Sequence, residues 1–125
     1  MRKRGYLLVM ALLGLTSCSG GGGAASAQIP VLLSPYDMSN KEAAAKNNEG
    51  VDHLVQKHYE VASRHLNEAI AAKGDFAEAH FNLAIAYDGM GKHPEATEAF
   101  KKAKRFGGDN REITENEILK KHLSP

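Results

Sequence analysis

Residues 77–110 read AEAHFNLAIAYDGMGKHPEATEAFKKAKRFGGDN, and their pattern repeats part of the 34 residues before them. Three apolar positions recur at this shift, pairing Ala62 with Ala96, Leu66 with Phe100, and Ala69 with Ala103. Within each copy these positions have the spacing i, i+4 and i+7, which places them on one face of a helix. Self-similarity at this period predicts two repeat units, residues 43–76 and 77–110.

The second unit resembles a tetratricopeptide repeat along its whole length. Leu83, Ala84 and Tyr87 occupy the signature places of its first helix, and Gly91 makes the turn. The first unit resembles a more divergent copy, in which Gly50 takes the small-residue place of Ala84. The resemblance implies an all-α fold of two helix–turn–helix repeats and a C-terminal solvating helix, which together form a right-handed α-solenoid fragment.

Local signals set the expected helix boundaries within a repeat domain of residues 39–125. Motifs of the form Ser/Asp-x-x-Glu, which begin at Ser39, Asp75 and Asp109, read as capping boxes. Pro94 suits the first turn of a helix, and Gly107 ends that helix. We expect helices at 40–56, 59–72, 76–90, 94–106 and 110–123, the last being the solvating helix.

The N-terminus has the composition of an export signal, residues 1–17. A positive RKR run precedes an apolar core of about ten residues, half the length that spans a membrane. The core ends in LTSC at residues 15–18, which resembles the lipobox of bacterial lipoproteins. This resemblance implies cleavage before Cys18, acylation of Cys18 by palmitate or a similar chain, and membrane anchoring. Ser19 after the cysteine implies sorting to the outer membrane.

Residues 18–38 form the expected flexible tether between the anchor and the domain. Their Gly- and Ser-rich start cannot bury enough apolar area to offset its ordering entropy. The run IPVLL at 29–33 is too apolar for a simple spacer, and it docks either on the domain or on a partner. Two repeats fall below the three usually needed for stability. The core is therefore completed by this run, by the last helix, or by self-association.

The resemblance also implies a concave face lined by the first helix of each pair. Asn48, Asn82 and Asn116 keep the same place at successive shifts of 34 residues. In related repeats such an asparagine hydrogen-bonds the backbone of the ligand, because an amide both donates and accepts. Val51 and Ile85 are either apolar groove contacts or core residues. The predicted partner-binding residues are Asn48, Val51, Phe81, Asn82, Ile85 and Asn116.

Other functional classes lack support in the sequence. Without its first 17 residues the chain has 13 basic and 15 acidic side chains, so it has no basic excess for nucleic acid. The six histidines form no His-x-x-x-His or His-Glu-x-x-His pair. No serine or threonine has a recognisable catalytic setting. We therefore expect no enzymatic activity, no cofactor and no metal.

These features predict an adaptor or assembly factor of the cell envelope. We expect it to be lipid-anchored at the periplasmic face of the outer membrane and to bind an envelope protein or peptide in its groove. The alternative is an obligate structural subunit that self-associates or stacks in a larger envelope complex.

Overall fold

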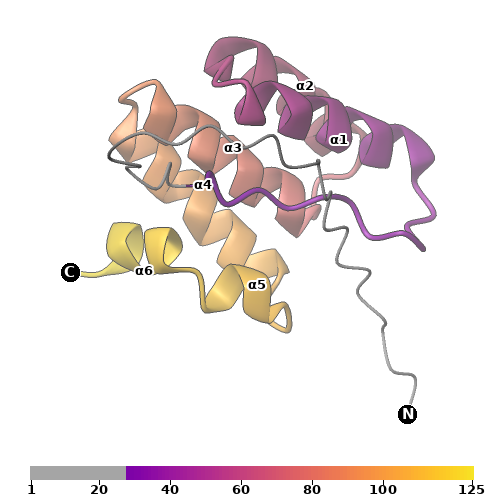
Figure 1. The fold of residues 1–125 in the computed structure, drawn as a ribbon. Helices are drawn as coiled ribbons and strands as arrows, with labels where there is room; N and C mark the ends of the chain where they lie inside the picture. Colours follow the sequence, from indigo (N-terminus) through magenta and orange to yellow (C-terminus); the bar gives the residue numbers. More distant parts are fainter. Residues whose placement is uncertain (1–27) are drawn as a thin grey trace, which may run out of the picture.

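The computed structural model describes residues 28–125 (Figure 1). The predicted signal peptide, Cys18 and residues 19–27 lie outside the described part. Within it the elements are six helices: α1 (Lys41–Val55), α2 (Tyr59–Ala72), α3 (Ala77–Gly89), α4 (His93–Phe106), α5 (Arg111–Thr114) and α6 (Glu117–Leu123).

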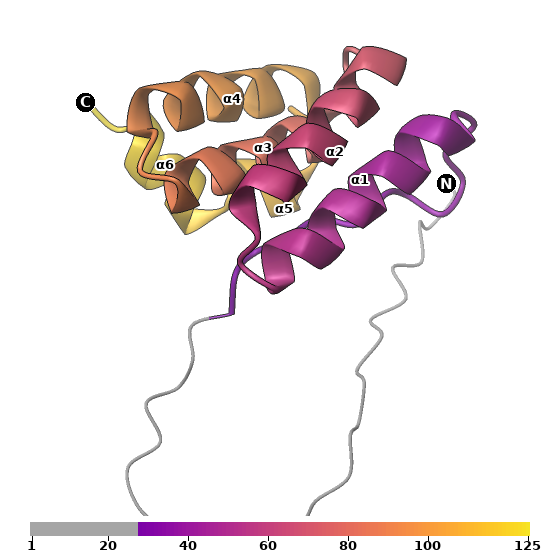
Figure 2. The same cartoon turned by 90° about the horizontal axis from the view of Figure 1, so that it is seen from above.

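The helices pair as two successive hairpins. α1 packs on α2, α3 packs on α4, and α2 joins the pairs by packing on α3 (Figure 2). The two short helices α5 and α6 lie against α4 at the C-terminal side of the molecule (Figure 1). The predicted all-α fold of helix–turn–helix units is confirmed.

The C-terminal helix differs from the expectation. Where one helix was predicted over 110–123, the chain forms α5 and α6, separated at Glu115 and Asn116. Asn116 adopts an extended backbone, and its side-chain oxygen accepts hydrogen bonds from the amides of Ile118 (3.0 Å) and Leu119 (3.4 Å). Asparagine is among the best residues for this capping position, so it starts a new helix instead of continuing the old one.

The helix N-termini also correct the predicted caps. The Asn40 side chain accepts from the Ala43 amide, and the Asn110 side chain accepts from the Glu112 amide, both at 3.0 Å. The residue before α3 is Phe76, which offers no capping side chain. The expected capping boxes that begin at Ser39, Asp75 and Asp109 therefore do not form.

One continuous core joins both hairpins to the C-terminal helices. The rings of Phe81 and Phe100 meet edge to face at its centre, with 5.5 Å between centroids. Ile113 from α5 and Leu119 from α6 are buried in the same cluster. Each such side chain contributes about 1.5–3 kcal/mol when fully buried. The C-terminal helices therefore help to close a core that two hairpins alone would leave open.

Residues 28–40 precede α1 as an extended stretch that docks on the domain. The stretch runs antiparallel to α1 and then turns back into it (Figures 1 and 2). Ile29, Val31 and Leu32 are partly buried against the core cluster. Of the two predicted destinations of the IPVLL run, the structure shows the domain.

Candidate functional site

The docked stretch lies in a groove whose central residue is Asn82 on α3. The Asn82 side-chain oxygen accepts from the Leu32 amide at 2.9 Å, and its side-chain nitrogen donates to the Leu32 carbonyl at 2.7 Å. One primary amide thus satisfies both backbone groups of one residue. Neither bond involves the Leu32 side chain, so this contact recognises an extended peptide backbone without reading its sequence.

Asn47 on α1 completes this contact. Its side-chain nitrogen donates to the Leu32 carbonyl and to the Ser34 hydroxyl, each at 3.1 Å, and its side-chain oxygen accepts from Asn82 at 2.9 Å. Asn47 and Asn82 are both fully buried. Each amide fixes the orientation of the other, and every polar atom of the pair has a partner, as a buried polar network requires.

Ser34 is held by α1 at the next position of the segment. Its amide donates to the Asn48 side-chain oxygen, and its hydroxyl donates to the Ala44 carbonyl, both at 3.0 Å. Leu33, between the two anchored residues, points away from the domain and is 63% exposed. The groove therefore holds residues 29–34 by backbone groups, by the Ser34 hydroxyl and by apolar contacts of Ile29, Val31 and Leu32.

The structure places the six predicted groove residues in three different settings. Asn48 and Asn82 hydrogen-bond backbone amides of the chain's own docked segment, and their contact with a partner stays a prediction. Phe81, Val51 and Ile85 are buried in the structure, in which the docked segment is in place. Asn116 is the cap of α6 described above and does not line the groove.

Asn47 is the residue that sequence reasoning missed. It precedes Asn82 by 35 residues, so a comparison at a shift of 34 pairs Asn82 with Asn48 instead. The signal that could have found it is the Asn47–Asn48 pair itself. On a helix, adjacent residues diverge by about 100°, so one of the two amides lies closer to the neighbouring helix.

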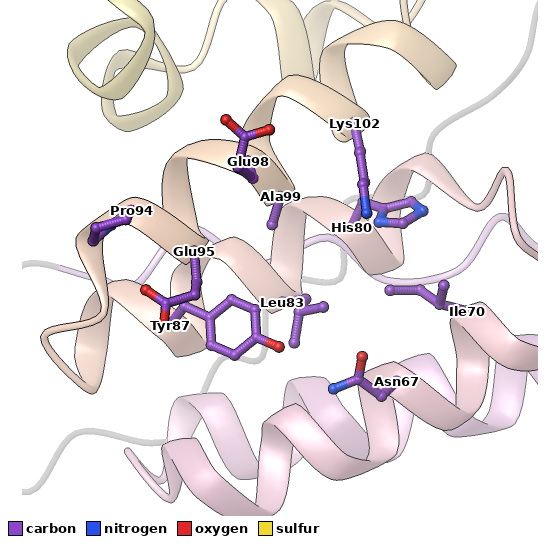
Figure 3. Close-up of a pocket in the computed structure, with 10 residues that line it drawn as sticks. All are labelled: Asn67, Ile70, His80, Leu83, Tyr87, Pro94, Glu95, Glu98, Ala99 and Lys102. Carbon is purple, nitrogen blue, oxygen red and sulfur yellow. The ribbon is translucent and has the colours of Figure 1, made fainter.

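A second hollow of about 400 Å³ lies on another face of α3 (Figure 3). Ile70 and Leu83 give it apolar walls, while Glu95 and Lys102 stand at its edge. His80 lies at one end, where its Nε2 hydrogen-bonds the Gly74 carbonyl at 2.9 Å. Burial lowers the pKa of His80, and the charge of Lys102 acts in the same direction. The hydrogen bond to the Gly74 carbonyl acts against these two effects on the pKa, and it makes the ring a structural link to the turn before α3.

The comparisons with known proteins agree with the geometry of the second hairpin. Residues 77–110 match the family model of the tetratricopeptide repeat. This match supports a tetratricopeptide repeat in this part of the chain, and such repeats generally bind protein partners. No curated protein and no solved structure gives a significant match to the chain. Among residues 28–125, no helix has the length and hydropathy to cross a membrane.

Proposed function

We propose that this protein is a lipid-anchored adaptor of the cell envelope. Its groove binds an extended segment of a partner protein, and its own residues 29–34 occupy the groove until that partner displaces them. The observation that carries the proposal is the double hydrogen bond between the Asn82 amide and the backbone of Leu32. The role is one of binding and not of catalysis.

The groove suits a partner segment of varied sequence. The five hydrogen bonds that Asn47, Asn48 and Asn82 make to residues 32–34 include four to backbone groups of Leu32 and Ser34. Backbone contacts are available to any extended peptide. Pro30 and Pro35 keep the resident segment extended, which reduces the entropy lost on docking. A partner segment with a similar bias would bind for the same reason.

The resident segment sets a minimum affinity that a partner needs in order to displace it. A segment joined by a short linker to its own site has an effective concentration on the order of millimolar. A competing peptide that makes only the same contacts would not displace it at ordinary cellular concentrations. The partner must therefore add contacts outside the groove, and this requirement selects a folded envelope protein over a free peptide.

The N-terminal sequence supports the anchoring part of the proposal. Cys18 ends the lipobox-like LTSC, and only ten residues separate it from Ile29. A flexible chain of that length has an average end-to-end distance of about 17 Å. Release of residues 29–38 would double the length of the linker. A domain whose groove holds its own segment would then stay near the bilayer. A domain whose groove holds a partner would extend farther from it.

The proposal is tested by mass spectrometry on protein purified from membranes of its native host after mild cross-linking. We expect an acylated N-terminus at Cys18 and one recurrent cross-linked partner. Asn82→Ala should reduce the yield of that partner at least about fivefold, because each buried polar group left unpaired costs about 1–3 kcal/mol. Asn67→Ala is the matched control, since Asn67 is exposed on α2 and bonds only the Ser63 carbonyl within its own helix.

Two outcomes would contradict the proposal. An unmodified chain that starts elsewhere would remove the lipid anchor. Acylated Cys18 with cross-links only between copies of this chain, insensitive to Asn82→Ala, would favour the alternative of a self-associating structural subunit.

A further inference from the structure

A cluster of three metal-ligating side chains lies away from the groove, where α6 meets the turn between α3 and α4. Asp88 comes from the end of α3, His93 from the first residue of α4, and His122 from α6. The Asp88 Oδ1 atom is 2.8 Å from His93 Nδ1 and 3.1 Å from His122 Nε2. All three side chains offer a ligand atom within 4.8 Å of one another.

The hydrogen bonding of His122 leaves one ring nitrogen facing a carboxylate. Thr97 donates its hydroxyl proton to the His93 carbonyl at 3.0 Å, so its oxygen can only accept from His122 Nδ1, 3.3 Å away. In the tautomer that donates from Nδ1 to Thr97, Nε2 carries the lone pair that a metal ion needs. His122 Nε2 and Asp88 Oδ1 are within hydrogen-bond distance in this structure, and a metal ion between the two atoms would replace that hydrogen bond.

We propose that Asp88, His93 and His122 form a binding site for a divalent transition-metal ion, of which Zn²⁺ is the best fit. Two imidazoles and one carboxylate are a ligand set that Zn²⁺ uses. Tetrahedral bonds of about 2.0–2.1 Å place neighbouring ligand atoms about 3.3 Å apart. The two distances to Asp88, 2.8 and 3.1 Å, need to open by a few tenths of an ångström, and the two histidine nitrogens, which lie within 4.8 Å of each other, need to reach the same spacing.

The surroundings complete the site. Thr97 is a hydrogen-bond partner for Nδ1 of His122, so Nε2 is the nitrogen left for a metal ion, and such a partner has the outer-shell role that hydrogen bonds play around metal ligands. A hollow of about 450 Å³ borders the cluster, lined by Asp88, His93, His122, Ile118 and the exposed Lys121. It leaves room for water as the fourth ligand, as in zinc sites with three protein ligands.

Metal binding at this place would fasten α6 to the second repeat. α6 has seven residues, too few to be stable as a helix by itself. Its Leu119 contributes to the closure of the core. The ion would therefore link three elements that otherwise meet through side-chain packing and hydrogen bonds. This stabilising role is separate from the proposed partner binding in the groove.

The site has a sequence signature that searches within one helix do not find. Asp88 and His122 are 34 residues apart, so they occupy equivalent places of successive units. His93 follows Asp88 by five residues, across the turn at Gly91. The expectation that the histidines form no metal site considered only spacings along one helix.

The test is calorimetric titration of the full chain with ZnCl₂ in detergent, after treatment with chelator. Every sample carries Cys18→Ser, which removes the one thiol of the sequence as a competing ligand. We expect the parent chain to bind one equivalent of Zn²⁺ at this site. In Asp88→Asn and in His122→Gln, this binding should be lost or its affinity should fall at least about tenfold. His58→Gln is the matched control, because His58 is exposed and outside the cluster.

A second readout separates a lost ligand from a lost fold. Co²⁺ in place of Zn²⁺ should give the visible absorption of a tetrahedral site in the parent chain, and Asp88→Asn, which preserves side-chain shape, should abolish it while helical circular dichroism is unchanged. Zn²⁺ should also slow amide exchange within 117–123. Absence of Zn²⁺ binding, or binding that survives both Asp88→Asn and His122→Gln, would overturn the proposal.

Discussion

At the scale of single residues, the two repeats differ most clearly in their turns. Gly91 ends the first hairpin helix of the second repeat with φ +73°, and Lys57 holds the equivalent place of the first repeat with φ +61°. A left-handed conformation costs a residue with a Cβ roughly 1–2 kcal/mol, whereas glycine adopts it freely. The first repeat therefore carries strain that the second avoids.

Substitution of Lys57 by glycine should stabilise the protein. We expect a gain of about 1 kcal/mol in the free energy of unfolding, which corresponds to a rise in Tm of roughly 4–8 °C for a domain of this size. Thermal unfolding followed by circular dichroism measures it. The reciprocal change, Gly91→Ala, should lower Tm by a similar amount. A lower Tm in Lys57→Gly would show that its side chain stabilises the turn more than its backbone strains it.

Residue-scale reasoning from the sequence identified the right kinds of side chain more reliably than the right positions. It placed caps at Ser39 and Asp109, but the next residues, Asn40 and Asn110, make the capping bonds. Adjacent Ser, Asp and Asn are almost equally good caps. Which of them caps the helix depends on where the chain enters it, and that direction is set by tertiary contacts that local patterns do not contain.

At the scale of helices, the periodicity of apolar and small residues carries most of the fold. The four helices of the two hairpins were predicted to within about a residue at each end, because Ala and Leu recur at helical spacing over 14 or so residues. The C-terminal region has only Ile113, Ile118, Leu119 and Leu123 as apolar residues. These fit one helix or two, and the single side chain of Asn116 decides between them.

The close approach of α1 and α2 depends on Gly50. A Cβ atom at this position would lie 2.6 Å from Cγ of Leu66, a fully buried side chain. Gly50→Ala should therefore overpack the hairpin and destabilise the protein by about 1–3 kcal/mol, measured by urea unfolding. Gly74→Ala is the control, since no atom lies within 4 Å of the added methyl group. Equal midpoints for the two variants would contradict this view of the hairpin.

At the scale of the whole molecule, the segment before α1 and the two short C-terminal helices cover core surface that the two hairpins leave open. Ile29, Val31 and Leu32 cover the core on the groove side, and α5 and α6 cover it at the C-terminal end. The apolar IPVLL run predicted that these residues dock somewhere. It could not predict the register, because that depends on Asn47, which the repeat alignment does not single out.

On the proposed function, the same segment gives the groove two states. With residues 29–34 docked, as in the structure, the amides of Asn47 and Asn82 are fully satisfied and fully buried. With the segment displaced by a partner, they would face the backbone of that partner. A groove that is always filled keeps its buried amides paired, which avoids a cost of about 1–3 kcal/mol for each unpaired group.

The most direct measurement is the affinity of a labelled peptide of residues 28–36, QIPVLLSPY, for three forms of the chain, read by fluorescence anisotropy. With residues 29–33 replaced by glycine and serine, the groove is open, and the peptide should bind at least about tenfold more tightly than to the parent chain, whose own segment competes. Adding Asn82→Ala to the open form should weaken binding at least about fivefold. A peptide with serine in place of the exposed Leu33 should bind as well as the original. Equal affinity for the open and parent forms, or binding unaffected by Asn82→Ala, would contradict a groove that holds extended peptide backbone.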